Sequence, residues 1–352
     1  MSVFALGIEL DGEGSHPAAW RRATHPPSES LSGRTLTQKV RAAENAGFTL
    51  ATFDDSILPP RSGITGRVDA VNRASFVAAT TSTIGLVPVV ETTYAEPFHT
   101  SSQLATLDYS SRGRAGWIAA RVADPAAARA WGRTALAEQA DLDREQLDSI
   151  TVVRELWDSW EDDAVVRDYA SGRFLDRDKL HYVDFEGQSF TVKGPAIVPR
   201  PPQGQLVVFG GEADHEQVDV VLVTEPDRDA AVETARRSAG LTFIELAVTL
   251  DTPHASAVDR LAALNGLTPT EPSRRLEYVG TPQGFVELLT DLAGHTEGVR
   301  LFPTVIDEDL PVLARYVLPA LFKSGVAHRP VPGSSLRSNL GLGRPANRHA
   351  RI

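Results

Sequence analysis

The chain of 352 residues contains no cysteine and a single methionine. The lack of cysteine excludes disulfides, thiolate nucleophiles and thiolate-bound metals, and is typical of proteins in a reducing compartment. No apolar run approaches the roughly 20 residues that a membrane-spanning helix needs, and the acidic start of the chain does not resemble a signal peptide. Acidic residues (46) outnumber lysine and arginine (35), and the net charge of −11 argues against nucleic acid as a partner. We therefore expect a cytoplasmic protein with a small-molecule ligand.

The sequence does contain a regular alternation of apolar runs of strand length with segments of helical spacing. The predicted strands are 4–10, 50–53, 84–90, 115–120, 206–209, 218–223, 243–248 and 299–302. The predicted helices are 37–45, 71–81, a segment opened by Pro97, 141–160, 227–239, 255–264, 281–293 and 310–322. The strands are almost continuously apolar, which indicates burial on both faces and hence a parallel sheet. Eight strands suit a (β/α)8 barrel, but a doubly wound open sheet gives a similar pattern, so both α/β folds remain open.

Two regions interrupt this alternation. Residues 171–205 form an insertion rich in proline and glycine, and we expect it to pack over one end of the fold. Residues 329–352 contain five arginines and no acidic residue, which favours a surface-wrapping or poorly ordered terminus. The expected organisation is one domain over residues 1–328, including the insertion, followed by the basic tail 329–352.

Ligands of α/β folds bind at the carboxyl ends of the strands, so polar residues just after each strand are the first candidates. Asp55 follows the second predicted strand, and Thr92 and Thr93 follow the third. These positions also have ordinary explanations, because acidic residues cap helices and threonine is frequent in strands. His16 lies beyond the first strand and is suited either to contact a ligand or to sit in a solvated loop.

Several motifs that would define a chemistry are missing from the sequence. The nine histidines are scattered without HExxH or another metal-ligand spacing, so we predict no metal site. The sequence has neither a GxSxG nucleophile elbow nor a phosphate-binding P-loop. The glycine pair ending in Gly211 indicates only a tight turn after a strand. The residues alone therefore leave the catalytic groups unknown.

Longer segments are more informative when they are read in order. They are HPAAWR (16–21), AENAGFTLATFDDS (43–56), TSTIGLVPVVETTYAEPFH (81–99), ATLDYSSRGRAGW (105–117), LWDSWEDDAVVRDYASGRF (156–174), FTVKGPAIVPRPPQG (190–204) and LRSNLGLGRPANR (336–348). This series resembles the bacterial-luciferase-like flavin monooxygenases, and within them the two-component, nitrilotriacetate monooxygenase-like enzymes that act on chelators and sulfur heterocycles. The resemblance implies a TIM barrel with an insertion after strand four and its helix, usually in a homodimer.

The resemblance also implies a cofactor and a set of contacts. The cofactor is reduced FMN, supplied by a separate NAD(P)H-dependent flavin reductase, and the flavin then activates O2. By position, Asp55, Thr92 and Thr93 correspond to residues beside the flavin ring, and Gly211 precedes the expected phosphate site. His16 lies in the opening loop, where it is a candidate for substrate binding.

The chain departs from this family's pattern where flavin contacts are expected. Ile118 stands in place of an asparagine amide, and Arg121 stands in place of a small hydroxyl residue. Arg121 is suited either to take the flavin phosphate or to pair with an acid at the rim. The segment 122–142 lacks the family's histidine and tyrosine. After Gly211 only about seven residues precede the next strand, too few for a crossover helix whose N-terminus receives a phosphate.

Two functions from different classes are therefore expected. The first is an FMN-dependent monooxygenase that acts on a small organic substrate with a remodelled cofactor site, which includes Asp55, Thr92, Thr93, Arg121 and Gly211. The alternative is a non-catalytic barrel of the same descent that acts as a binding or partner subunit. A deazaflavin-dependent oxidoreductase is a third possibility within the same superfamily.

Overall fold

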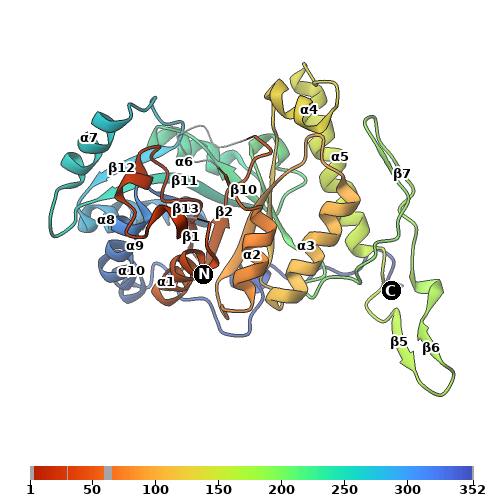
Figure 1. Cartoon of the computed structure of the whole chain (residues 1–352). Coiled ribbons are helices and arrows are strands. Elements are labelled where there is room, and N and C mark those ends of the chain that lie inside the picture. The colour runs from red at the N-terminus through yellow and green to blue at the C-terminus, as the bar shows by residue number, and fades with distance from the viewer. Residues whose placement is uncertain (1–3, 30, 59–65, 351–352) are drawn as a thin grey trace.

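The computed structural model describes residues 4–29, 31–58 and 66–350, which form a closed barrel of parallel strands surrounded by helices (Figure 1). The barrel strands, in chain order, are β1 (Ala5–Glu9), β2 (Leu50–Phe53), β3 (Gly85–Glu91), β4 (Gly116–Ala120), β9 (Val207–Gly210), β10 (Val220–Val223), β11 (Leu241–Leu250) and β13 (Gly298–Pro303). Each pairs in parallel with its neighbours, and the pairing of β10 with β11 closes the ring. The barrel is therefore confirmed over the doubly wound sheet, and its strands coincide with the predicted ones.

One further strand, β12 (Leu276–Gly280), was not predicted. It pairs with residues 246–250 of β11, beyond the point where β10 has ended, and so lies outside the ring. Apart from Leu276 its residues are exposed or half-buried. A strand without a buried face lacks the continuous apolar run that identified the others.

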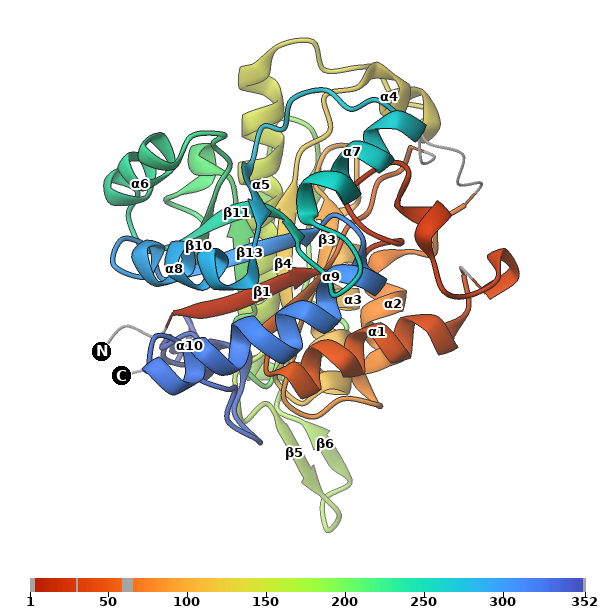
Figure 2. The same ribbon diagram turned by 90° about the vertical axis from the view of Figure 1, so that its left-hand side faces the viewer.

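The helices cover the outside of the barrel (Figure 2). They are α1 (Gly33–Ala46), α2 (Ala70–Ala78), α3 (Pro97–Ser111), α4 (Pro125–Trp131), α5 (Gln139–Asp158), α6 (Arg228–Arg237), α7 (Ala257–Leu267), α8 (Pro282–Leu292), α9 (Ile306–Val312), α10 (Leu318–Ser324) and α11 (Leu336–Asn339). Their ends carry ordinary caps: the Ser32 side chain accepts a hydrogen bond from the backbone of α1, and Gly47 ends that helix with φ 101°. The short helix α4 was not predicted.

The connection from β9 to β10 is short, as the sequence indicated. In place of a crossover helix it contains one 3-10 turn, Glu212–Asp214. The carboxylate of Asp219 holds this connection, because it accepts hydrogen bonds from the Val208 backbone (2.9 Å) and from Arg154 of α5 (2.8 Å). Asp219 also forms an ion pair with Arg337 of the C-terminal tail (3.1 Å).

The insertion after α5 forms two antiparallel hairpins. The first, β5 (Val165–Asp168) with β6 (Arg173–Leu175), projects from the barrel (Figures 1 and 2). The second consists of β7 (Phe185–Glu186) and β8 (Thr191–Val192). The hairpins thus begin at Val165, earlier in the chain than the composition of the insertion suggested.

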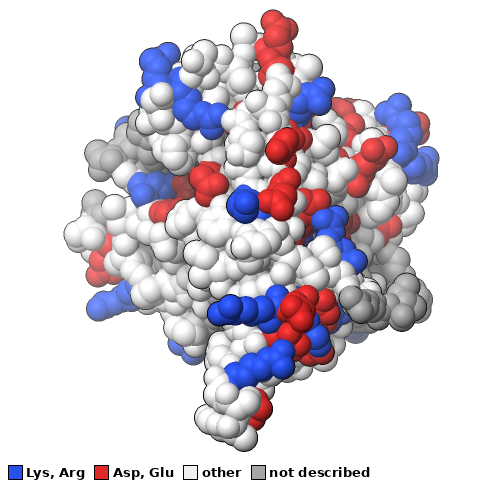
Figure 3. Space-filling model, turned by 90° about the vertical axis from the view of Figure 1, so that its right-hand side faces the viewer, with Lys and Arg blue, Asp and Glu red and all other residues white. Residues whose placement is uncertain are grey.

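The described part of the C-terminal tail packs into the molecule rather than only over its surface. Leu336 and Leu340 are buried in one cluster with Ala5, Leu50 and Val87, which point into the barrel. Arginines of the tail pair with acids: Arg337 with Asp219 at 3.1 Å, and Arg344 with Asp162 and Arg348 with Glu155, both at 2.6 Å. Arg329 instead donates to the carbonyl oxygen of Asn45. Positive and negative side chains are correspondingly interspersed on the face shown in Figure 3.

Within the described residues, no helix is both long and apolar enough to cross a membrane. The same residues contain no group of three or more His, Cys, Asp or Glu side chains arranged to hold a metal ion.

Candidate functional site

The two threonines at the end of β3 are buried, and their hydroxyls are used inside the chain. Thr92 Oγ1 lies 3.1 Å from the carbonyl oxygen of Ala120 and 3.3 Å from Gln146 Oε1. Thr93 Oγ1 accepts a hydrogen bond of 3.1 Å from the backbone N–H of Val122. A cavity of about 10 Å³ lies beside Thr92, roughly the space of one water molecule.

Arg121 and Gly211 meet at the carboxylate of Asp214. Asp214 Oδ2 accepts hydrogen bonds from the Gly211 backbone N–H (3.0 Å), from Gln146 Nε2 (2.6 Å) and from Arg121 Nη2 (3.2 Å). Arg121 also pairs with Asp143. Burial raises the pKa of Asp214, and the charge of Arg121 opposes that rise only partly. Of the two roles expected for Arg121, the structure shows the ion pair with acids.

Through Gln146, three of the predicted residues, Thr92, Arg121 and Gly211, form one connected group with Asp214 at its centre. Thr93 lies beside this group as the chain neighbour of Thr92 and bonds the Val122 backbone. Arg121, Gln146 and the Gly211 backbone all donate to the carboxylate of Asp214, and we call these four residues the Asp214 cluster. Sequence reasoning missed Gln146 and Asp214, because Gln146 comes from the middle of α5 and nothing local marks it. Asp214 lies within the short connection between β9 and β10, which the sequence marked only by its length.

The neighbouring residues of β4 point to opposite sides of the barrel wall. Ile118 lies in the interior with Val89 and Phe209, where its side chain fills core space. Trp117 faces outward and packs edge-on against Trp157 of α5, with ring centroids 6.4 Å apart. Trp117 is thus a core residue, as its position favoured.

Asp55 and His16 lie outside the Asp214 cluster. The Asp55 carboxylate accepts hydrogen bonds from the backbone of Ala70, at the start of α2, and of Ser56, at 2.5 and 2.8 Å. His16 is buried, its Nε2 lies 3.1 Å from Asn265 Oδ1, and its Nδ1 accepts from the backbone of Ala18 at 3.0 Å. The solvated-loop interpretation of His16 is therefore wrong.

A buried group of charges near the mouth of the barrel was not predicted as a site. Arg300 of β13 donates to Glu245 Oε1 (2.7 Å) and to Thr52 Oγ1 (3.0 Å), and it pairs with Glu9. Burial alone would raise the pKa of Glu9, but the charge of Arg300 and hydrogen bonds hold it below its usual value. These residues were visible as charges inside otherwise apolar strands. Next to them, burial and the charge of Glu9 raise the pKa of Asp54 to about 6.

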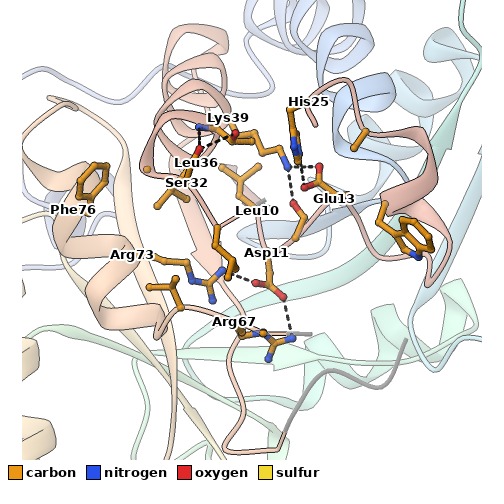
Figure 4. Close-up of a pocket in the computed structure, with 18 of the residues that line it drawn as sticks. Leu10, Asp11, Glu13, His25, Ser32, Leu36, Lys39, Arg67, Arg73 and Phe76 are labelled. Carbon is orange, nitrogen blue, oxygen red and sulfur yellow. Dashed lines mark hydrogen bonds and ion pairs between the residues drawn. The ribbon is translucent and has the colours of Figure 1, made fainter. Parts of the chain in front are cut away.

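A much larger cavity than the one beside Thr92 lies between the loop after β1, the start of α1 and the helix α2 (Figure 4). Its volume is about 530 Å³, which is within the range of small-molecule sites. Its lining includes Leu10, Asp11, Lys39, Arg73 and Phe76. None of the six residues predicted from the sequence lines it.

A closed barrel of parallel strands with helices outside is a TIM barrel. This one carries an insertion after α5 and has polar groups at the carboxyl ends of its strands, where ligands of this fold bind. A sequence model of the luciferase-like monooxygenases matches residues 15–237, which is more than half of the chain. The chain therefore belongs to the luciferase-like monooxygenase family, as the sequence resemblance indicated.

Individual relatives cover nearly the whole chain. One of the subunits of pristinamycin IIA synthase from Streptomyces pristinaespiralis is 33% identical and covers 93% of this chain and 95% of its own length. N-acetyl-S-(2-succino)cysteine monooxygenase from Bacillus subtilis is 25% identical, with 98% of each chain covered. Among solved structures, the EDTA monooxygenase from Chelativorans sp. BNC1 superimposes with a TM-score of 0.83 at 20% identity, covering 97% of this chain and 99% of that one.

Proposed function

We propose that this chain serves as a subunit of a flavin-dependent, luciferase-like monooxygenase and leaves flavin binding to a partner chain of the same fold. The observation that carries the proposal is the occupation of the Asp214 cluster. Its N–H donors surround a carboxylate of the chain itself, in the place where the family resemblance puts the flavin phosphate.

The arrangement of the other candidate residues supports the same proposal, because it does not fit FMN. The hydroxyls of Thr92 and Thr93 are used inside the chain, that of Thr92 with Ala120 and Gln146 and that of Thr93 with the Val122 backbone. Ile118 offers no hydrogen bond and belongs to the barrel core. Each charge-assisted hydrogen bond withheld from a ligand costs about 1.5–3 kcal/mol, so the loss of two or three lowers affinity by about a hundredfold or more.

The pristinamycin IIA synthase relative gives further support, because a protein named as one subunit of a synthase is similar to this chain over nearly its full length. We infer that the partner binds reduced FMN, which a separate reductase supplies, and that the partner's flavin reacts with O2 and a small organic substrate. In this arrangement the present chain contributes a protein surface and ligand contacts rather than the flavin site.

The second candidate function is a homodimeric monooxygenase in which this chain binds reduced FMN itself. The family membership and the retained Asp55, Thr92 and Thr93 favour it. It requires the Asp214 side chain to move away from the Gly211 backbone and from Arg121 so that a phosphate can enter.

A flavin titration separates the two functions. We expect the purified full-length chain to bind neither oxidised nor reduced FMN up to about 1 mM, a free energy of binding weaker than about −4 kcal/mol. Flavin fluorescence quenching and thermal shift measure the oxidised form, and anaerobic thermal shift measures the reduced form. Saturable binding at micromolar FMN would reject the partner-chain proposal in favour of the second candidate.

The replacement Asp214→Ser tests the reason for this expectation. It removes the carboxylate and frees the Gly211 N–H and Arg121 for an external anion, so inorganic phosphate should bind to the variant at millimolar concentration and not to the parent. Phosphorus NMR line broadening measures binding, and circular dichroism checks the fold. Glu212→Ser, which removes an exposed charge from the same turn, is the matched control and should behave like the parent. Equal phosphate binding by all three proteins would contradict the occupied-anion-site interpretation.

A further inference from the structure

The cavity beside α1 and α2 has the two properties of a small-molecule site: apolar walls and a few polar groups in fixed positions. Leu10, Leu36 and Val68 contribute to the walls, together with the aromatic rings of Trp20 and Phe76. Phe76 remains 56% exposed and Trp20 43% exposed, so both rings are available to a ligand. We call this cavity the α1–α2 pocket.

The polar side chains of the α1–α2 pocket form two ion-pair groups (Figure 4). In one, the Asp11 carboxylate binds Arg73 at 2.5 Å and Arg67 at 3.1 Å. In the other, the Glu13 carboxylate binds Lys39 at 2.6 Å and His25 at 2.7 Å. The carboxylates of both groups, Asp11 and Glu13, lie in the loop after β1, so this loop fixes where the cations of the pocket are held.

The cations outnumber the anions in this lining. The lining contains the cations Lys39, Arg67 and Arg73 and the carboxylates of Asp11 and Glu13. Behind the lining, the charge of Arg67 also acts on Asp54 and Glu91, and that of Arg73 acts on Asp55. Burial lowers the pKa of His25, but its hydrogen bonds to the Pro26 carbonyl and to Glu13 outweigh this and raise it overall. The residues that line the pocket therefore carry more cations than carboxylates, in a chain whose own net charge is −11.

Arg73 supplies an independent indication of a ligand. Its side chain is more than nine-tenths buried, yet its Nε–H has no hydrogen-bond partner among the described residues. Its Nη atoms donate to Asp11 and to the Asp54 carbonyl oxygen. An unsatisfied buried donor is costly. Because this Nε is itself closed to solvent, the Arg73 side chain must turn slightly towards the pocket for an acceptor of a bound molecule to satisfy it. Among the described residues, Arg67 pairs with Asp11 through Nη2 at 3.1 Å, and its planar guanidinium has the geometry to bind a carboxylate.

We propose that the α1–α2 pocket binds a small molecule with an apolar, ring-sized body and a single carboxylate, with the carboxylate held by Arg67 and Arg73 and the body packed against Phe76. This site is separate from the Asp214 cluster, so the proposal goes beyond the proposed function and does not depend on which chain holds the flavin.

Binding of 2-naphthoate and of 2-naphthamide to the full-length chain tests this proposal, because the two probes share a shape and differ in charge. Isothermal titration should show that the carboxylate binds at least about tenfold more tightly than the neutral amide, which is about the effect of one charge-assisted hydrogen-bonded contact. Added salt should reduce this preference, since part of it is electrostatic.

Variants test which residue binds the carboxylate of the probe and which residue packs against its ring. Arg67→Gln should markedly reduce the preference for the carboxylate, with Arg73 retaining the remainder, and should leave amide binding unchanged, whereas Phe76→Ala should weaken both probes. Arg41→Gln, an exposed position on α1 outside the pocket, is the matched control for the first change, and Phe174→Ala on the exposed hairpin controls for the second. Both controls should bind like the parent.

Three results would overturn the proposal: no naphthoate binding up to about 5 mM, equal affinities for the two probes, or an unchanged preference in Arg67→Gln. If naphthoate fails to bind and Phe76→Ala also lowers the molar mass measured by light scattering, the pocket belongs to a protein interface and not to a small molecule.

Discussion

Replacing Arg300 with methionine is expected to lower the free energy of unfolding by about 3–5 kcal/mol at pH 7. Arg300 is 5% exposed and neutralises two carboxylates inside the barrel, Glu9 and Glu245. Methionine has a similar volume, so little cavity forms, and the main cost is the buried Glu9 left without its cation, since Glu245 keeps an ion pair with Arg275 (3.0 Å). Urea denaturation followed by tryptophan fluorescence measures the change.

The pH dependence identifies the cause of this loss. In the parent, the pKa of Glu9 lies below its usual value of 4.5, so Glu9 contributes stability above pH 4.5 that disappears as the pH falls through its folded pKa. In Arg300→Met the lowering by Arg300 is gone and burial raises the pKa of Glu9. Protonation then favours the folded state, so the stability gap between parent and variant should narrow from pH 7 towards pH 4.5.

Two further proteins control this experiment. Arg228→Met removes an arginine that pairs with Asp291 at the surface and should leave the denaturation midpoint unchanged. The double variant Arg300→Met, Glu9→Gln removes the uncompensated charge and keeps the ion pair of Glu245 with Arg275, so it should recover most of the lost stability. A loss for Arg300→Met that is the same at pH 7 and pH 4.5 would argue for a packing defect and against the charge explanation.

The barrel was predictable because its strands are buried on both faces and therefore read as unbroken apolar runs. The strand β12 escaped prediction because its exposed residues interrupt such a run. The packing of the tail escaped for a different reason. Local sequence around Leu336 is polar and arginine-rich, and the space that receives Leu336 is formed by Gly85 and Gly116, far away in the chain. Long-range complementarity of this kind leaves no local pattern.

The candidate site was predictable in part. Strand ends correctly brought Thr92, Thr93 and Arg121 into one region, because parallel strands present their carboxyl ends on one side. The partners that decide their chemistry, Gln146 and Asp214, come from a helix and a turn, and no spacing rule links them to the strands. The α1–α2 pocket depends on the surfaces of two packed helices, so it was visible only in three dimensions.

The tail makes its own contribution to stability: Leu336→Ala is expected to cost about 2–5 kcal/mol. Leu336 is fully buried and closes the amino end of the barrel between two glycines. A Cβ placed on Gly85 would lie 2.7 Å from Leu336 Cδ1, and one on Gly116 would lie 3.0 Å from Cδ2. Because the surrounding strands are fixed by their hydrogen bonds, we expect the site to collapse little and the cavity to remain. Val331→Ala, at a 59% exposed position of the same tail, should have little effect.

A double-mutant cycle with Gly85→Ala separates this close fit from a general loss of apolar surface. In the parent, the new methyl group meets Leu336 and should destabilise the barrel by about 1–3 kcal/mol, the usual cost of overpacking. In the Leu336→Ala background that contact is absent and the methyl group enters the vacated space, so Gly85→Ala should cost markedly less. Urea denaturation of the four proteins gives the interaction energy. Additive effects would mean that Leu336 does not fill the barrel end beside Gly85, and the tail would then be a covering segment and not the closure of the barrel.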